Sequence, residues 1–196
     1  MTITAAMVKE LREKTNAGMM DCKEALQESN GDMEKAIDYL RKKGMAASEK
    51  RSGREAKEGL IDAYIHPGNR LGVLIEVNCE TDFVAKNEEF KKFTRNMAMQ
   101  VAASNPLVVK REDLSPEKIE KELDVYRGQA REAGKPEDII DKIANGKLNK
   151  YYQDVCLLEQ SFIRNPEKTV EDMVNDIRAI IGENIVIRRF ERFQLG

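Results

Sequence analysis

The sequence predicts an α+β protein in which a module of three short helices precedes a core domain with a three-stranded antiparallel sheet covered by helices. Three observations indicate this class. Apolar residues recur at helical spacing through residues 1–44, two strand-like runs flank a turn at residues 66–69, and residues 184–193 are rich in β-branched and aromatic types. We therefore expect a helical module at residues 1–44, a basic linker at 45–57 and an α+β core at 58–196.

The helical module is predicted from three amphipathic segments whose ends are marked by capping and turn residues. Thr4 and Asp32 are suitable N-caps, and Gly18, Gly31 and Gly44 stand where a chain leaving a helix often needs a left-handed residue. The expected buried faces are Ile3, Met7, Val8 and Leu11; Cys22, Ala25 and Leu26; and Met33, Ala36, Ile37 and Leu40.

Two methionines, Met19 and Met20, lie beside the first of these glycine turns. A methionine pair next to a small bundle is more often core than interface, but the flexible side chain also adapts well to a partner surface. We expect one of the two to face outwards.

The linker region is basic. Residues 41–57 carry seven Lys or Arg residues against two Glu, a net charge of plus five. Such a segment can meet phosphates or an acidic protein surface, yet no aromatic residues are interleaved to stack on bases. We favour a solvated, partly helical connector, and an RNA-binding protein that uses Lys50, Arg51 and Arg54 is the alternative.

The core begins with strand-like runs at residues 60–65 and 71–79, which the turn His66-Pro67-Gly68-Asn69 joins as a hairpin. Residues 184–193 supply the third strand.

Several helices are predicted between the hairpin and this last strand. Each start or stop has a local signal: Asn87 caps the first helix, Asn105-Pro106 stops it, and Ser115-Pro116 and Pro136 open the next two. Thr169 and Asp172 resemble a capping box at the start of the last helix, and Gly182 ends it.

Phe83 belongs to neither the strand that ends at Cys79 nor the helix that begins near Asn87. It is therefore predicted on a short turn at the end of the sheet. Spacing alone favours a Phe83 that folds back and plugs its own domain. The alternative is a contact with a partner, for which such a turn is a natural place.

Composition narrows the function classes. Cys22, Cys79 and Cys156 are far apart and without Cys-x-x-Cys spacing, so we expect packing residues, no metal and no disulfide. No apolar stretch is long enough for a membrane span, and we expect a soluble, cytoplasmic protein. With 33 basic and 35 acidic residues, the whole chain shows no imbalance that points to nucleic acid or membrane.

The sequence shows little evidence of a catalytic site. His66 is the single histidine, and no nucleophile and carboxylate surround it in a known motif. A hydrolase that uses His66 with a nearby carboxylate is the remaining rival from the enzyme class. We expect no covalent catalysis, no cofactor and no nucleotide site.

Four ordered segments resemble the signatures of the bacterial elongation factor Ts family, the nucleotide exchange factors for elongation factor Tu. They span nearly the whole chain, and their order and spacing match as well as their residues. The segments read LREKTNAGMMDCKEAL at residues 11–26, EVNCETDFVAKNEEF at 76–90, LLEQSF at 157–162 and IGENIVIRRF at 181–190.

The resemblance implies a UBA-like first module that grips the nucleotide domain of elongation factor Tu, with Leu11, Met19 and Met20 as candidate contacts. It also implies that the turn Thr81-Asp82-Phe83-Val84 dislodges the magnesium ion of the partner, with Phe83 as a wedge and Asp82 disturbing polar contacts nearby. The partner is then elongation factor Tu, GDP-bound and nucleotide-free, with no direct nucleic acid and no membrane.

Two residues depart from the family pattern, Asn16 in place of glycine and Ser161 in place of proline, and neither is expected to abolish function. The chain resembles the short form of the family. Longer members add a second core subdomain and a helical hairpin, so we expect that two short chains can supply the duplicated core as a homodimer.

Overall fold

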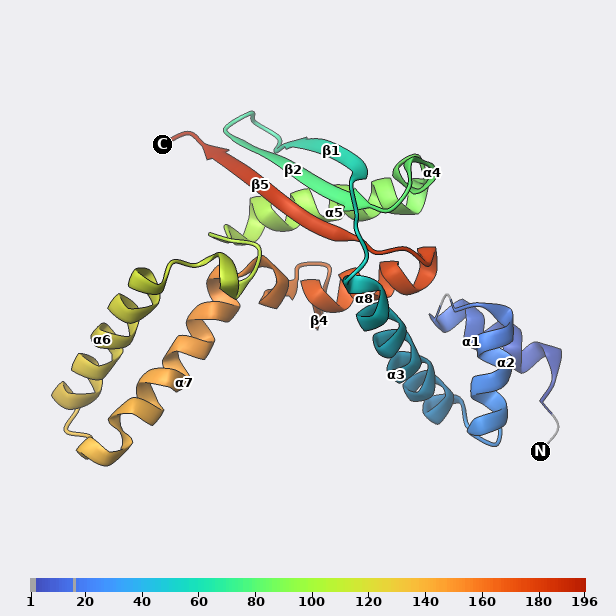
Figure 1. Cartoon of the computed structure of the whole chain (residues 1–196), viewed down its shortest axis with the longest axis horizontal. Coiled ribbons are helices and arrows are strands. Elements are labelled where there is room, and N and C mark those ends of the chain that lie inside the picture. The colour runs from blue at the N-terminus through green and yellow to red at the C-terminus, as the bar shows by residue number, and fades with distance from the viewer. Residues whose placement is uncertain (1–2, 16) are drawn as a thin grey trace. The chain divides into compact units, whose positions relative to one another are not determined.

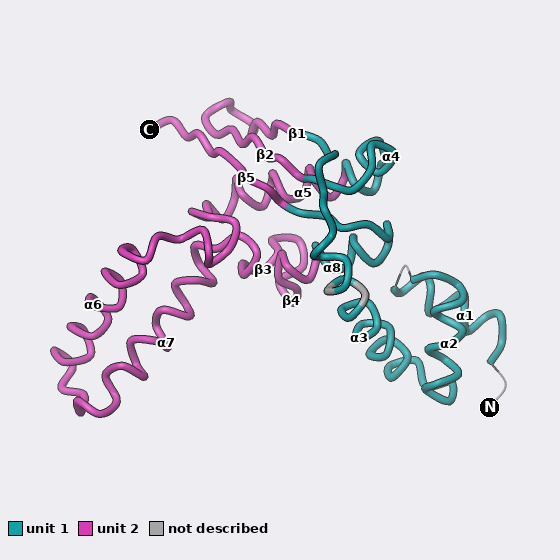
Figure 2. Tube along the Cα trace, viewed as in Figure 1, with its two compact units in different colours: residues 1–60, 78–91, 174–186 teal, residues 61–77, 92–173, 187–196 magenta. Residues whose placement is uncertain are grey.

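The computed structural model describes residues 3–15 and 17–196, so Asn16, one of the two departures from the family pattern, lies outside the described residues. The chain divides into two compact units (Figure 2). Unit 1 comprises residues 1–60, 78–91 and 174–186, and unit 2 comprises residues 61–77, 92–173 and 187–196. The fold is α+β, as predicted.

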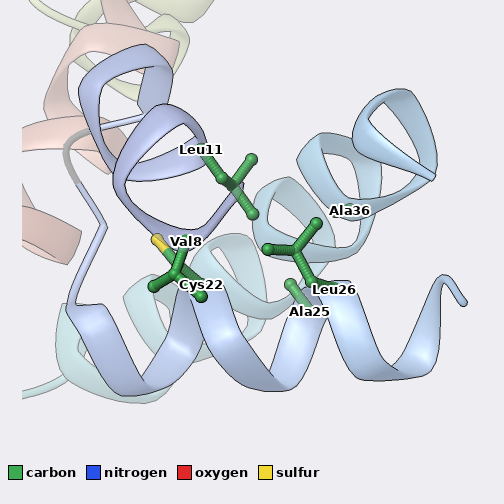
Figure 3. Packing of buried hydrophobic residues seen from close by; sticks show 6 residues of the cluster. All are labelled: Val8, Leu11, Cys22, Ala25, Leu26 and Ala36. Carbon is green, nitrogen blue, oxygen red and sulfur yellow. The ribbon is translucent and has the colours of Figure 1, made fainter. Parts of the chain in front are cut away.

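The helical module is built from α1 (Ala5–Thr15), α2 (Met19–Glu28) and the first part of α3 (Met33–Ser52). The predicted apolar faces meet in one small core, whose buried members are drawn in Figure 3. They are Val8, Leu11, Cys22, Ala25, Leu26 and Ala36. Asp32 caps α3, because its carboxylate accepts a hydrogen bond from the Lys35 backbone N–H at 3.1 Å. The N-cap prediction is confirmed.

Helix α3 is longer than predicted. It continues through Gly44 to Ser52, although an interior glycine costs a helix about 1 kcal/mol relative to alanine. The continuation packs on α8 (Val170–Ile181): a Cβ at Gly44 would lie 3.9 Å from the Ala179 side chain, and the buried Ser48 hydroxyl donates to Asn175 Oδ1 at 2.6 Å. Much of the basic linker is therefore helical.

The sheet has the order β1-β2-β5, from strands β1 (Glu58–Ile65), β2 (Leu71–Cys79) and β5 (Val186–Gln194). The predicted hairpin turn is confirmed, with positive φ angles of 94° at Gly68 and 54° at Asn69. Alternate residues of β2 are buried, and helix α5 (Glu88–Ser104) covers this side of the sheet in unit 2 (Figure 1). The guanidinium of Arg95 on α5 donates to the β1 carbonyl of Ala63, which ties helix to sheet.

Helices α6 (Pro116–Glu132) and α7 (Glu137–Val155) form a hairpin closed by a short loop (Figure 1). Ser115 caps α6 as predicted, accepting from the Lys118 N–H at 3.3 Å. A small core joins the two helices near the base of the hairpin, with Leu148, Tyr152 and Cys156 among its buried members. Both helices begin where the sequence predicted helix starts, at Ser115-Pro116 and at Pro136.

Two very short strands, β3 (Ser161–Phe162) and β4 (Asn165–Thr169), were not predicted. They are too brief for a period of two to be visible in sequence, and their position depends on the buried amide of Gln100, which accepts from the Ile163 N–H at 2.8 Å and donates to the Ser161 carbonyl at 3.1 Å. Two single-turn 3₁₀ helices, Arg111–Asp113 and Leu157–Glu159, complete the elements outside the site.

The last helix begins as predicted. The hydroxyl of Thr169 accepts from the Asp172 N–H at 3.1 Å, and the Asp172 carboxylate accepts from the Thr169 N–H at 3.0 Å, so the capping box is complete. Gly182 ends the helix with a φ of 87°. None of the helices in the described part of the chain is long and apolar enough to cross a membrane.

Candidate functional site

Phe83 lies on α4 (Asp82–Ala85), a single helical turn at the end of β2 in unit 1. Thr81 is its N-cap and accepts from the Val84 N–H at 3.4 Å. The Phe83 side chain is 81% exposed, so it does not fold back into its own domain. The core-plug interpretation is therefore wrong for this conformation, and a large apolar side chain stands in solvent at a fixed place in the fold.

The turn that carries Phe83 is anchored by Glu183, which follows Gly182 at the end of α8. The Glu183 carboxylate accepts three hydrogen bonds: from the Glu80 N–H at 3.1 Å, from the Thr81 N–H at 3.0 Å and from the Thr81 hydroxyl at 2.6 Å. Bonds to an ionised acceptor are about twice as strong as neutral ones. The start of α4 is thus held by a residue that is 102 positions away from Thr81 in sequence.

A second carboxylate, that of Glu80, joins the same two segments in the opposite direction. Glu80 accepts from the Asn184 N–H at 2.6 Å, so each of the two segments supplies a carboxylate to the backbone of the other. The buried Asn184 side chain donates to the carbonyls of Ser52 and Arg54 at 3.2 and 2.7 Å. Residues 183–184 therefore connect three parts of unit 1: the turn before α4, the end of α8 and the end of α3.

The charges around α4 are paired locally. Asp82 accepts from Lys86 at 2.7 Å, and this hydrogen bond is the main reason why the pKa of the Asp82 carboxyl is lowered. The thiol of Cys79 donates to the Thr81 carbonyl at 3.1 Å. Burial, followed by the nearby charge of Glu183, raises the pKa of Cys79 to about 11, so this thiol stays protonated at neutral pH and is a poor nucleophile.

The three candidate contacts in the helical module fall into two groups. Met19 and Met20 on α2 are 59% and 76% exposed, so both face outwards where only one was expected to do so. Leu11 is completely buried in the module core. The methionines are exposed apolar surface, whereas Leu11 belongs to the core of the module.

Sequence reasoning missed Glu183 and Asn184 as parts of the site. Both lie in the fourth family-like segment, but nothing in residues 181–190 alone shows which part of the chain they would contact. The one available signal was a polar pair directly after a helix-ending glycine, where a side chain is free to turn away from the helix axis.

The structure does not support the hypothesis of a hydrolase that uses His66. His66 is exposed, and the hydrogen bond described for its ring joins Nδ1 to the Tyr64 hydroxyl at 2.9 Å. Among the described residues, no group of three His, Cys, Asp or Glu side chains is placed to hold a metal ion.

The RNA-binding alternative loses much of its proposed surface. Arg51 donates to the Arg178 carbonyl at 3.3 Å, and Arg54 pairs with Glu80 at 3.5 Å. Two of the three basic side chains that this alternative requires are thus engaged inside unit 1.

Comparison with known proteins, together with this fold, places the chain in the class of translation elongation factors. The sequence model described as Elongation factor TS matches residues 3–196. Among curated relatives, Elongation factor Ts of Syntrophus aciditrophicus is 61% identical over 196 residues, which is 100% of this chain and 98% of the relative. The chain belongs to the elongation factor Ts family.

Two further relatives agree in name and extent. Elongation factor Ts of Syntrophobacter fumaroxidans is 59% identical over 194 residues, covering 99% of this chain and 97% of the relative. Elongation factor Ts of Geotalea daltonii is 57% identical over 196 residues, covering 100% and 91%. The match thus includes both the helical module and the anchored turn.

Proposed function

We propose that this protein is a guanine nucleotide exchange factor that binds elongation factor Tu with GDP, displaces the magnesium ion and promotes GDP release, so that GTP can bind. The observation that carries the proposal is the exposure of Phe83 on an anchored turn. An exchange factor needs an apolar group that it can insert into a partner without reorganising itself, because a pre-ordered contact loses little entropy on binding. We place this activity in the cytoplasm, where translation takes place.

In the proposed mechanism Phe83 enters an apolar pocket of the partner, and Asp82 disturbs polar contacts beside it. The elements that hold magnesium and phosphate then shift, and the nucleotide loses ligands. No covalent step is involved, so the protein itself needs neither a nucleophile nor a cofactor.

Phe83 alone is insufficient by magnitude. Burial of one Phe side chain contributes about 1.5–3 kcal/mol. Inversion of a two-state population from 1:99 to 99:1 takes about 5.5 kcal/mol of differential binding. The remainder is assigned to other contacts, for which the exposed Met19 and Met20 of the helical module are the first candidates. Leu11 contributes by holding α1 against α2.

Thermodynamic linkage gives the proposal a second consequence. A factor that accelerates GDP release binds the nucleotide-free partner more tightly than the GDP complex. Added GDP must then weaken binding of the factor by the same ratio, because the coupling free energy is reciprocal.

The test is stopped-flow release of a fluorescent GDP analogue from elongation factor Tu at fixed magnesium, with wild-type protein and with Phe83→Ala. Loss of about 1.5–3 kcal/mol predicts a maximal rate roughly 10- to 150-fold lower for the variant. The matched control is Leu107→Ala, since Leu107 is also an exposed apolar residue but lies in unit 2, outside the strands of the sheet. It should keep the wild-type maximal rate.

The outcomes separate function from mechanism. Acceleration by wild type but not by Phe83→Ala supports both the exchange function and the wedge. Equal acceleration by both proteins moves the mechanism to other surfaces, and no acceleration by wild type refutes the exchange function. A large loss of thermal stability in Phe83→Ala would conflict with the exposed position of the side chain.

We also propose that the chain forms a homodimer through its sheet. Ile61, Leu74 and Phe193 are exposed apolar residues on the three strands, and Leu74 alternates with the buried residues Val73 and Ile75. Apolar side chains on the open side of a sheet are typical of an interface. A monomer mass in light scattering at micromolar concentration would count against this proposal.

The division of labour along the chain is part of the proposal: a binding module at residues 1–44, a connector at 45–57 and an exchange and dimerisation core at 58–196. Because α3 extends to Ser52, the first proteolytic cut in the connector is expected within residues 53–57. Early cleavage within the core would contradict this organisation.

A further inference from the structure

We propose that Glu183 is a positioning residue for exchange: its carboxylate fixes the direction in which α4 presents Phe83. The inference rests on the proposed function, in which Phe83 is the wedge, and adds a residue that does not itself touch the partner. It is carried by the three hydrogen bonds that the Glu183 carboxylate accepts at the start of α4.

The geometry of the anchor follows from the end of α8. Gly182 adopts a φ of 87°, a left-handed conformation that L-residues with a side chain adopt only with strain, and the chain turns there out of the helix. Glu183 then faces the two peptide N–H groups at residues 80 and 81. These two donors come directly before α4 and would have no helical partner of their own.

A carboxylate suits this place better than any neutral side chain. Its two oxygens offer about four acceptor sites, and here Oε2 accepts both backbone N–H groups while Oε1 accepts the Thr81 hydroxyl. A glutamine of the same size presents one oxygen and one NH₂ group. Its single oxygen can accept the two backbone N–H groups only in weaker neutral bonds, and its NH₂ group faces the Thr81 hydroxyl, which must then turn to accept instead of donate.

The Thr81 hydroxyl links the Glu183 carboxylate to α4. It donates to Glu183 at 2.6 Å and accepts from the Val84 N–H at 3.4 Å. Phe83 lies between Thr81 and Val84 on a helix of one turn, and its own carbonyl accepts from the Lys86 N–H at 3.3 Å. The contacts of Thr81 with Glu183 and Val84 fix the N-terminal side of this turn. Loss of the carboxylate therefore frees the direction of the exposed ring without removing any buried apolar side chain.

The consequence for exchange is a loss of orientation. A misplacement of about 1 Å in a positioned group can lower a rate by about 100-fold. We expect Glu183→Gln to lower the maximal rate of GDP release by roughly 10- to 100-fold. The concentration of factor that gives half the maximal rate should change much less, because Met19 and Met20 are untouched.

The first experiment needs no partner. The chain contains no tryptophan, so Phe83→Trp introduces a unique fluorophore at the wedge. In this background Glu183→Gln should lower the fluorescence anisotropy of Trp while the circular dichroism spectrum and cooperative unfolding persist. The matched control is Glu171→Gln, an exposed glutamate in the first turn of the same helix, which should leave the anisotropy unchanged.

A milder pair of variants guards against misfolding of Glu183→Gln. Thr81→Val removes the hydroxyl that joins Glu183 to Val84 and should also lower the anisotropy, whereas Thr81→Ser keeps the hydroxyl and should restore it. Unchanged anisotropy in both Glu183→Gln and Thr81→Val would overturn the inference.

The second experiment is a double-mutant cycle on GDP release with Glu183→Gln and Phe83→Ala. A residue that acts through Phe83 has no effect once Phe83 is gone, so the two losses should not add. Additive losses would overturn the positioning role. If the wild-type protein fails to accelerate release, the proposed function falls, and the anisotropy measurement still decides whether Glu183 orders the turn.

Discussion

Truncation of Leu11 to alanine should unfold the helical module while the core keeps its structure. Leu11 is completely buried among five other fully or largely buried residues, and no polar contact compensates for its loss. Removal of a buried Leu side chain costs about 2–5 kcal/mol, the larger values where the surroundings cannot collapse into the cavity.

The stability of the module sets the scale for this loss. At roughly 0.05–0.15 kcal/mol per residue, a segment of about 45 residues has only about 2–7 kcal/mol of its own. The cost of Leu11→Ala therefore equals most or all of that amount. Local unfolding of α1 and α2 is expected at room temperature, because these helices are too short to persist alone.

Amide hydrogen exchange followed by mass spectrometry measures this directly. In Leu11→Ala, peptides from residues 5–28 should lose protection, while peptides from β2 and α5 should keep it. Met20→Ala is the matched control, because Met20 lies on the same module but is 76% exposed and should change protection little. Equal protection of the module in both variants would refute the burial argument.

The same comparison separates two ways of losing exchange activity. Leu11→Ala should weaken binding to elongation factor Tu through the unfolded module, and Met20→Ala through the lost contact alone. Weaker binding together with normal hydrogen-exchange protection of residues 5–28 is expected only for Met20→Ala.

Two further predictions concern single residues near the site. Gly182→Ala should destabilise the protein by about 1–2 kcal/mol in urea unfolding, because the φ of 87° is unfavourable for any residue with a Cβ, whereas Gly128→Ala within α6, where no heavy atom lies within 4 Å, should be neutral or stabilising. Burial raises the pKa of Cys79 from 9.0 to about 11, so its stabilising contribution is complete below pH 9 and is lost as the pH rises towards 11. The urea midpoint of the wild type should therefore fall more steeply over that window than that of Cys79→Ala, and parallel profiles would contradict the raised pKa.

The sequence by itself determined the elements whose ends are local. The capping box at Thr169 and Asp172, the cap of α6 at Ser115 and the turn at Gly68 all depend on residues within four positions of one another. The apolar faces of the module were predictable for the same reason, since periodicity reports which side of a helix is buried. Four short segments were enough to indicate the family.

The tertiary structure alone decided where α3 ends and which way Phe83 points. Helix α3 continues past Gly44 because its C-terminal part packs on α8. There the Ser48 hydroxyl donates a hydrogen bond to Asn175, 127 positions away in sequence. Phe83 stays outside because Glu183 holds the preceding residues from more than a hundred positions away. Such contacts are formed by packing between distant segments of the chain. Neither helix propensity nor the spacing of residues within one segment shows which other segment it will contact.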